Sequence, residues 1–125
     1  MIHGIGIDIV SVERIQKNIS RYGSRFPEKI LTASELEEYA KNSYPARFLA
    51  KRFAAKEALA KALGTGFRDG IHLAQITVTH NSAGRPQLSF DGNINKILSV
   101  NKIQNCYLSL SDEKEYACAV VVLEY

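Results

Sequence analysis

The sequence lacks the features by which membrane and secreted proteins are usually recognised. Its longest apolar run, residues 117–123, is too short to span a bilayer. Residues 1–8 contain neither a basic leader nor the apolar centre of a signal peptide. We therefore expect a soluble cytoplasmic protein that makes no contact with a membrane.

Cysteine, histidine and excess charge are also scarce. Cys106 and Cys118 have neither the paired spacing nor the nearby histidines of a zinc site. The scattered His3, His72 and His80 are expected to pack or lie on the surface. A net charge of +3 favours acidic partners only mildly, so an acidic protein, a phosphorylated small molecule and nucleic acid all remain open.

The remaining composition is that of an ordinary globular protein. Hydrophobic residues make up 46% of the 125 residues and charged residues 23%, which is far from the composition of disordered chains. This length suits one domain with one core, so we expect a single domain over residues 1–125.

The first segment has the two-residue period of a β-strand. Over residues 2–10, Ile5 and Ile7 share one face, while Gly4, Gly6 and Asp8 share the other. Glycines on one face of a strand indicate close approach by another backbone or by a ligand. We expect such an approach beside Asp8.

The rest of the chain has helical patterns first and mainly strand patterns after them. An amphipathic helix follows residue 12, a capping box at Thr32 and Glu35 opens a second through about residue 41, and the strongest helix runs over 45–63 before Gly64. Strands are predicted at 76–79, 87–90, 106–111 and 116–124, with a short helix at 93–99. Tight turns between strands predict an α+β fold, with a mainly antiparallel sheet packed against one long helix and several short helices.

The long helix carries the most suggestive charges. Glu57 and Lys61 lie four residues apart and share a face, which by itself suits an ordinary surface ion pair. The helix also carries more basic residues than its one acid, Glu57, requires. This imbalance suits phosphate groups, although plain solvation explains it too.

Asp8 is the second candidate, because it follows an apolar strand where an unpaired charge would be costly. Together with Glu57 it provides the two carboxylates that Mg²⁺ commonly takes alongside phosphate and water. Gly4 and Gly6 do not complete a dinucleotide-binding turn, and the segment from Gly64 lacks the lysine and hydroxyl of a P-loop.

Four segments together resemble the holo-acyl-carrier-protein synthases, the small bacterial type of phosphopantetheinyl transferase. They are GIGIDIV (4–10), RFAAKEALAKA (52–62), GTG (64–66) and SLSDEKEYA (109–117). The resemblance covers nearly the whole chain. It implies transfer of 4'-phosphopantetheine from coenzyme A to a serine of apo acyl carrier protein, in support of fatty acid biosynthesis.

The resemblance also implies roles for individual residues. It makes Asp8 and Glu57 the Mg²⁺ ligands and places Lys61 beside the reacting phosphates, with Glu57 as our hypothesis for the base. Contacts to the acidic carrier protein are expected from Arg14, Arg21 and Arg25. The residues expected to contact coenzyme A are Arg47, Arg52, Lys56, Lys61 and Gly64. A homotrimer with active sites between subunits is implied as well.

One position departs from the family pattern. Asp112 stands where many members have histidine, and aspartate cannot be a cationic phosphate contact at neutral pH. Two alternatives stay open. One is the same transfer to carrier domains of a specialised synthase. The other is a basic binding module without catalysis, although no nucleic-acid motif supports it.

Overall fold

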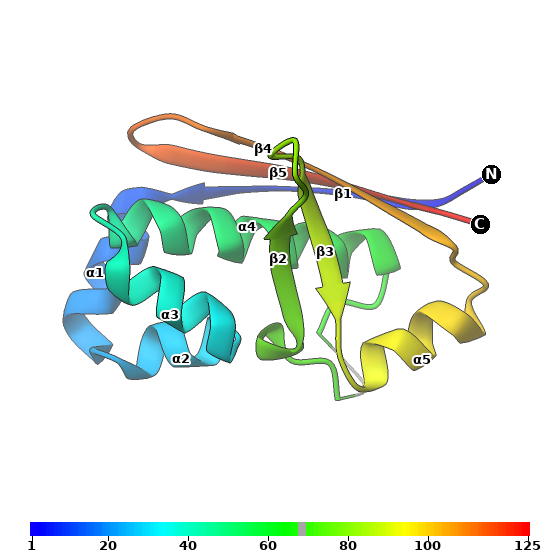
Figure 1. The fold of residues 1–125 in the computed structure, drawn as a ribbon, viewed down its shortest axis with the longest axis horizontal. Coiled ribbons are helices and arrows are strands. Elements are labelled where there is room, and N and C mark those ends of the chain that lie inside the picture. Colours follow the sequence, from blue (N-terminus) through cyan, green and yellow to red (C-terminus); the bar gives the residue numbers. More distant parts are fainter. Residues whose placement is uncertain (68–69) are drawn as a thin grey trace.

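The computed structural model describes residues 1–67 and 70–125, in which a run of four helices follows the first strand and the later strands come in pairs (Figure 1). In chain order they are β1 (Ile2–Ser11), α1 (Val12–Tyr22), α2 (Arg25–Ile30), α3 (Ala33–Lys41), α4 (Pro45–Leu63), the 3₁₀ turn η1 (Leu73–Gln75), β2 (Ile76–His80), β3 (Pro86–Phe90), α5 (Asn93–Val100), β4 (Asn105–Asp112) and β5 (Tyr116–Glu124). The α+β prediction is confirmed.

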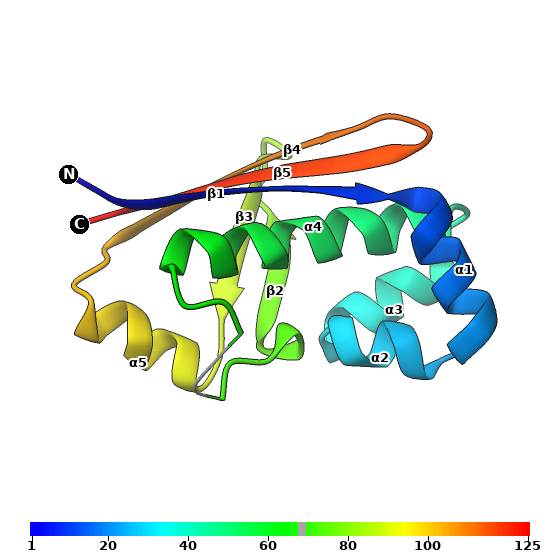
Figure 2. The ribbon, with the colours of Figure 1, turned by 180° about the vertical axis from the view of Figure 1, so that it is seen from behind.

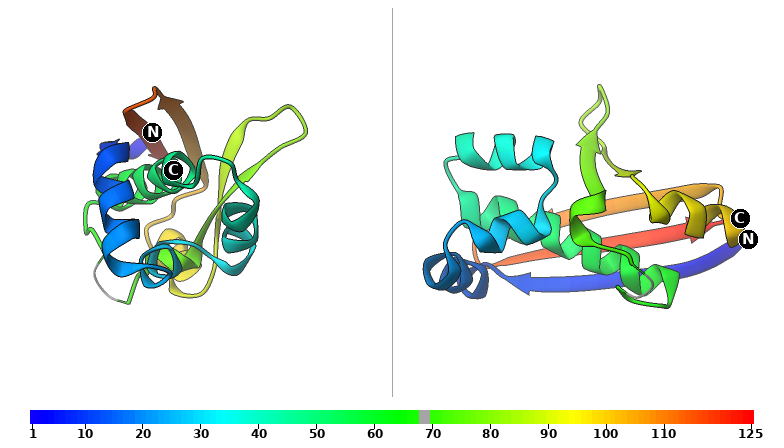
Figure 3. Two further views of the ribbon diagram at one scale, coloured as in Figure 1. Left: turned by 90° about the vertical axis from the view of Figure 1, so that its left-hand side faces the viewer. Right: turned by 90° about the horizontal axis from the view of Figure 1, so that it is seen from below.

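The strands form two sheets, and every pairing between them is antiparallel. The first has the order β1-β5-β4, with Ile7 opposite Val120 and Leu108 opposite Val121. The second is the hairpin β2-β3, which projects from the body of the molecule (Figure 3). The strands sit where the sequence predicts them, but the hairpin is a separate sheet.

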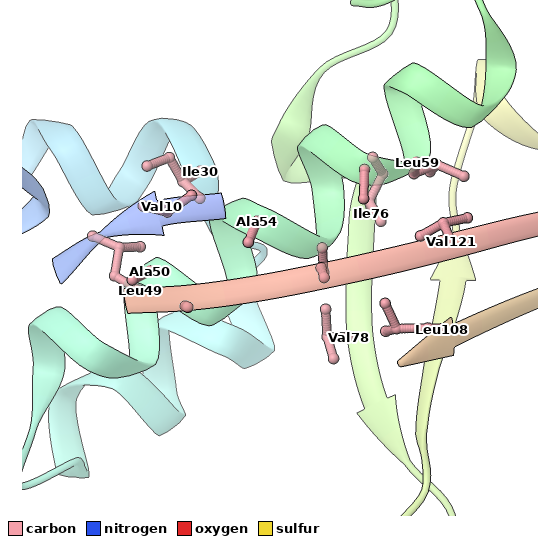
Figure 4. Close-up of a cluster of buried hydrophobic side chains, with 14 of the residues drawn as sticks. Val10, Ile30, Leu49, Ala50, Ala54, Leu59, Ile76, Val78, Leu108 and Val121 are labelled. Carbon is pink, nitrogen blue, oxygen red and sulfur yellow. The ribbon is translucent and has the colours of Figure 1, made fainter. Parts of the chain in front are cut away.

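Helix α4 lies beneath the three-stranded sheet, and the helices all lie on that side of it (Figures 1 and 2). The helix is mostly buried, including Ala50, Ala54 and Ala58 with no exposed surface. Small alanine side chains let the sheet approach the helix closely while keeping its helical propensity high. Leu59, Val121 and other apolar side chains fill the space between the layers (Figure 4).

The two glycines of β1 face α4, which confirms the predicted backbone approach. A Cβ added to Gly6 would lie 2.7 Å from the Ala62 nitrogen and closer still to the Ala58 oxygen. A Cβ at Gly4 would collide with the Ala62 carbonyl in the same way. Glycine is therefore required where the strand carrying Asp8 crosses α4.

Helix ends follow the predicted capping residues, with one exception. Thr32 and Glu35 form a complete capping box on α3, and Gly64 ends α4 with a φ of 83°. Helix α2 was not predicted, because it is short and has no side-chain cap. Pro27 is accommodated in the first turn, where its missing N–H costs nothing.

None of the helices in the described part of the chain is long and apolar enough to cross a membrane.

Candidate active site

A pocket of about 310 Å³ opens where the end of β1 meets the start of α1 and the middle of α4. Residues 8–18 and Phe26 supply one part of its wall, and Phe53 and Glu57 of α4 supply the other. Charged and apolar groups share the lining: Asp8, Ile9, Val10, Ser11, Arg14, Ile15, Asn18, Phe26, Phe53 and Glu57. The structure thus brings Asp8 and Glu57 into one cavity, as the sequence analysis expected.

Lys61 joins this pair from the next turn of α4. Its Nζ donates hydrogen bonds to Asp8 Oδ1 and to the Ile7 carbonyl oxygen, each at 3.0 Å. The Lys61 side chain is 54% exposed and that of Asp8 is 16% exposed. Lys61 is therefore both anchored to the strand and reachable from solvent, as a contact for an anionic ligand must be.

Glu57 is held in a less favourable environment. Burial raises the pKa of its carboxyl above 4.5, the charge of Asp8 raises it further, and Lys61 partly opposes the rise. A carboxyl group whose ionisation is opposed by burial and by a nearby carboxylate is a candidate ligand for a cation.

The carboxylates of Asp8 and Glu57 suit Mg²⁺ as part of a ligand set that the oxygens of a phosphate substrate and water would complete. The described residues contain no group of three or more His, Cys, Asp or Glu that could hold a metal by themselves. Mg²⁺ commonly takes one or two carboxylates and completes its shell with substrate oxygens and water. The open pocket leaves room for those further ligands.

Arg14 contributes to the same pocket from the first turn of α1. Ser11 caps this helix by accepting a hydrogen bond from the Arg14 backbone nitrogen at 3.3 Å. Arg21 and Arg25 are also exposed, on α1 and at the start of α2. The three arginines expected to contact the carrier protein therefore lie on consecutive helices, and Arg14 lines the pocket that contains Asp8 and Glu57.

Arg47 lies elsewhere. It is near the start of α4, where its guanidinium is 3.5 Å from Asp112 at the end of β4 and stacks over Tyr44 at 5.4 Å. Strands β4 and β1 are the two edges of the sheet. Arg47 therefore lies beside one edge strand, whereas Asp8 belongs to the other. Gly64 is exposed, with open space beside it, and its N–H bonds back to the last turn of α4.

Arg52 and Lys56 correct our expectation that they contact coenzyme A. The Lys56 side chain has no exposed surface, and that of Arg52 is 6% exposed. Their cationic groups instead pair with Glu35 and Glu38 of α3. Helix α4 turns these side chains inward, away from Lys61, so its basic residues do not form one phosphate-binding face.

Several pocket residues escaped the sequence analysis. Phe26 lies on the helix that was missed, and Ile15 and Asn18 carry no chemical signal of their own. Phe53 lies one turn before Glu57, so its position on this face could be inferred from helical spacing alone.

The sequence profile of the 4'-phosphopantetheinyl transferase superfamily matches residues 4–121. The chain belongs to this superfamily. Among its curated relatives, the holo-[acyl-carrier-protein] synthase of Nitrosospira multiformis is 49% identical over 124 residues, covering 99% of both chains.

Solved structures of superfamily members give the same picture. The holo-[acyl-carrier-protein] synthase of Neisseria meningitidis superposes with a TM-score of 0.96 at 42% identity, covering the whole of both chains. The corresponding synthase of Helicobacter pylori, solved in complex with coenzyme A, gives 0.83 at 32% identity, covering 96% of this chain and 99% of the other.

Proposed function

We propose that this chain is a holo-acyl-carrier-protein synthase, acting in the cytoplasm in support of fatty acid biosynthesis. It transfers 4'-phosphopantetheine from coenzyme A to a serine hydroxyl of apo acyl carrier protein and releases adenosine 3',5'-bisphosphate. The observation that carries the proposal is the convergence of Asp8 and Glu57 in one open pocket, with Lys61 hydrogen-bonded to Asp8 beside it. Similarity to a synthase solved with coenzyme A supports the choice of donor.

Asp8 and Glu57 would hold Mg²⁺, which when bound neutralises the charge on the diphosphate of coenzyme A. Lys61 is placed to stabilise the leaving phosphate, because its ammonium group is exposed beside Asp8. The serine oxygen attacks the β-phosphorus, and the bond from that phosphorus to the bridging oxygen breaks. The leaving group is the adenosine 3',5'-bisphosphate.

Glu57 is our candidate for the group that accepts the serine proton. A general base works best when its pKa lies near the working pH. The pKa of a free carboxyl group lies well below neutral pH. Burial and the charge of Asp8 raise the pKa of Glu57 in that direction. A cation bound at Glu57 would oppose this shift, so the proton-accepting role and the ligand role are separate hypotheses about the same carboxyl group.

The carrier protein would dock on α1 and α2 through Arg14, Arg21 and Arg25. These exposed cations suit an acidic partner, and Arg14 links the docking surface to the pocket. Arg47 and the exposed Gly64 remain proposed contacts for coenzyme A.

A homotrimer is supported by the outer face of the three-stranded sheet. Ile5, Ile7 and Ile9 are 60–66% exposed on the face opposite α4, beside Val120 and Val122 of β5. A continuous apolar sheet face of this kind usually marks a protein interface. Light scattering should give three times the chain mass for the wild type and a lower mass for Ile7→Lys. A wild-type monomer would contradict the assembly.

Transfer itself is tested by mass spectrometry of apo acyl carrier protein after incubation with coenzyme A, Mg²⁺ and the protein. We expect the mass of one phosphopantetheine group to be added, and the addition to stop with a chelator. Glu57→Gln should abolish it, whereas Glu37→Gln, at an exposed site on α3, should not. Full transfer by Glu57→Gln at saturating Mg²⁺ would reject both roles of Glu57.

The same assay separates the alternatives. Carrier domains of a specialised synthase can be offered in place of acyl carrier protein, and preferential labelling of those domains would change the acceptor while keeping the chemistry. Absence of transfer to any carrier, with retention of nucleic acid in a gel-shift assay, would favour the binding module.

A further inference from the structure

The buried ammonium group of Lys56 joins two helices to α4. Its Nζ donates one hydrogen bond to the Ile30 carbonyl oxygen and another to Glu35 Oε1, both at 2.6 Å. Ile30 is the last residue of α2, and Glu35 lies in the first turn of α3. Lys56 therefore holds the α2-to-α3 junction against α4.

The carboxylate of Glu35 extends this connection to the hairpin. Oε1 also accepts from the Thr32 backbone nitrogen at 3.0 Å, and Oε2 accepts from the Val78 nitrogen of β2 at 2.9 Å. Arg52 lies beside it, with its Nε 3.8 Å from Oε2. One carboxylate with 1% of its surface exposed thus meets α3, α4 and β2.

Such an arrangement is costly to build. Burial lowers the pKa of Lys56, and the charge and hydrogen bond of Glu35 oppose that shift. Buried ion pairs often contribute little net stability compared with well-packed apolar residues. What this pair does provide is a fixed geometry, because both partners have several hydrogen bonds that an apolar contact would not impose.

The geometry that it fixes includes the proposed transfer site. Lys56 immediately precedes Glu57 on α4. It also holds the last residue of α2, the helix that carries Arg25 and Phe26. Phe26 lines the pocket with Asp8 and Glu57. Arg25 belongs to the proposed docking surface. A shift of α2 would therefore move a pocket wall and a docking residue relative to Glu57.

We propose that Lys56, with Glu35, is a positioning residue that fixes α2 relative to the transfer pocket. A carrier protein docked on α2 would then present its serine to Glu57. This inference rests on the proposed function. It reassigns Lys56 from a contact of coenzyme A to a residue that acts through Arg25 and Phe26.

Steady-state kinetics with the two substrates varied separately test this role. Lys56→Met keeps the length and volume of the side chain but removes the charge and both hydrogen bonds. Loss of a charged hydrogen bond should raise the KM for carrier protein by about tenfold. The KM for coenzyme A should stay within about twofold, because Lys56 has no exposed surface to offer that substrate.

Hydrogen exchange supplies a readout that does not depend on activity. In Lys56→Met, amide protection should fall in residues 25–31 and stay unchanged in the β1-β5-β4 sheet. Lys51→Met is the matched control, since it removes a cation from the same helix at a partly exposed position. It should leave both KM values and the exchange of α2 as in the wild type.

The possible outcomes are distinct. An unchanged KM for carrier protein in folded Lys56→Met, or equal changes in both KM values, would overturn the positioning role. If Lys56→Met does not fold, Lys56→Gln keeps a donor at this site and is measured in the same way. Failure of both variants to fold would assign Lys56 to stability alone, which also rejects the inference. Absence of transfer by the wild type would instead reject the proposed function.

Discussion

Replacing Gly6 by alanine is expected to damage the pocket without altering any of its charged groups. Gly6 lies two residues before Asp8 on the face of β1 that packs against α4. The new Cβ would lie 2.7 Å from the Ala62 nitrogen and 2.9 Å from the Ala58 carbonyl carbon. All of these neighbours are backbone atoms of a buried helix, so none of them can turn aside.

The distances set the size of the effect. An ordinary contact between carbon and a backbone atom begins at about 3.4 Å, so strand and helix must separate by roughly 0.7 Å or more. Overpacking of this kind costs about 1–3 kcal/mol, which for a domain of this length lowers Tm by roughly 3–15 °C. The displacement also separates Asp8 from Glu57, and errors of about 1 Å in a site can cost up to 100-fold in rate.

Thermal melting and transfer rate should be measured on the same Gly6→Ala sample, well below its Tm. We expect kcat to fall by about tenfold or more even where the protein is fully folded. Ser20→Ala, an exposed change on α1, provides the control. Wild-type Tm together with wild-type kcat would refute the reasoning, because it would mean that β1 and α4 can separate freely.

Three further predictions concern the charged groups. The raised pKa of Glu57 means that the folded protein binds this proton more tightly than the unfolded chain does, so stability is lost as pH rises from 4.5 through the folded pKa. Glu57→Gln should therefore raise Tm near neutral pH without Mg²⁺, with the gain disappearing below pH 4.5; an equal gain at both pH values would contradict this. Asp112→Asn should change stability by at most about 1 kcal/mol, since its pair with Arg47 is partly exposed. The same change should lower the KM for coenzyme A by freeing Arg47. A raised KM for coenzyme A would show that Asp112 holds Arg47 in place. Arg14→Ala should raise the KM for carrier protein and weaken its salt dependence, and an effect confined to coenzyme A would reject the docking surface.

Local signals in the sequence predict most of the secondary structure. The capping box at Thr32, the proline at residue 45 and the glycine at residue 64 mark helix ends through hydrogen bonds and backbone angles that depend on neighbouring residues only. The glycines on one face of residues 2–10 likewise predict the side of β1 on which another backbone comes close. Helix α2 was missed because it has six residues and no side-chain cap.

The burial of charged residues could not be predicted in the same way. Lys56 and Lys61 are both lysines on one helix, yet one side chain is fully buried and the other 54% exposed. The difference depends on the placement of Glu35, Ile30 and Asp8, which lie between 21 and 53 residues away along the chain. Glu35 was recognisable as a capping residue, but nothing local indicates that it also binds Lys56 and Val78.

The same long-range packing explains why the candidate site lies where it does. Close contact between β1 and α4 requires Gly4 and Gly6, and that contact brings Asp8 to the face of the helix that carries Glu57 and Lys61. Burial and the charge of Asp8 oppose the ionisation of Glu57, so the apo protein gives up stability at this pocket. A cation bound between the two carboxylates would recover it. Addition of Mg²⁺ should accordingly raise the Tm of the wild type at neutral pH and leave that of Glu57→Gln much less affected. Equal stabilisation of both would mean that Glu57 does not take part in binding the ion.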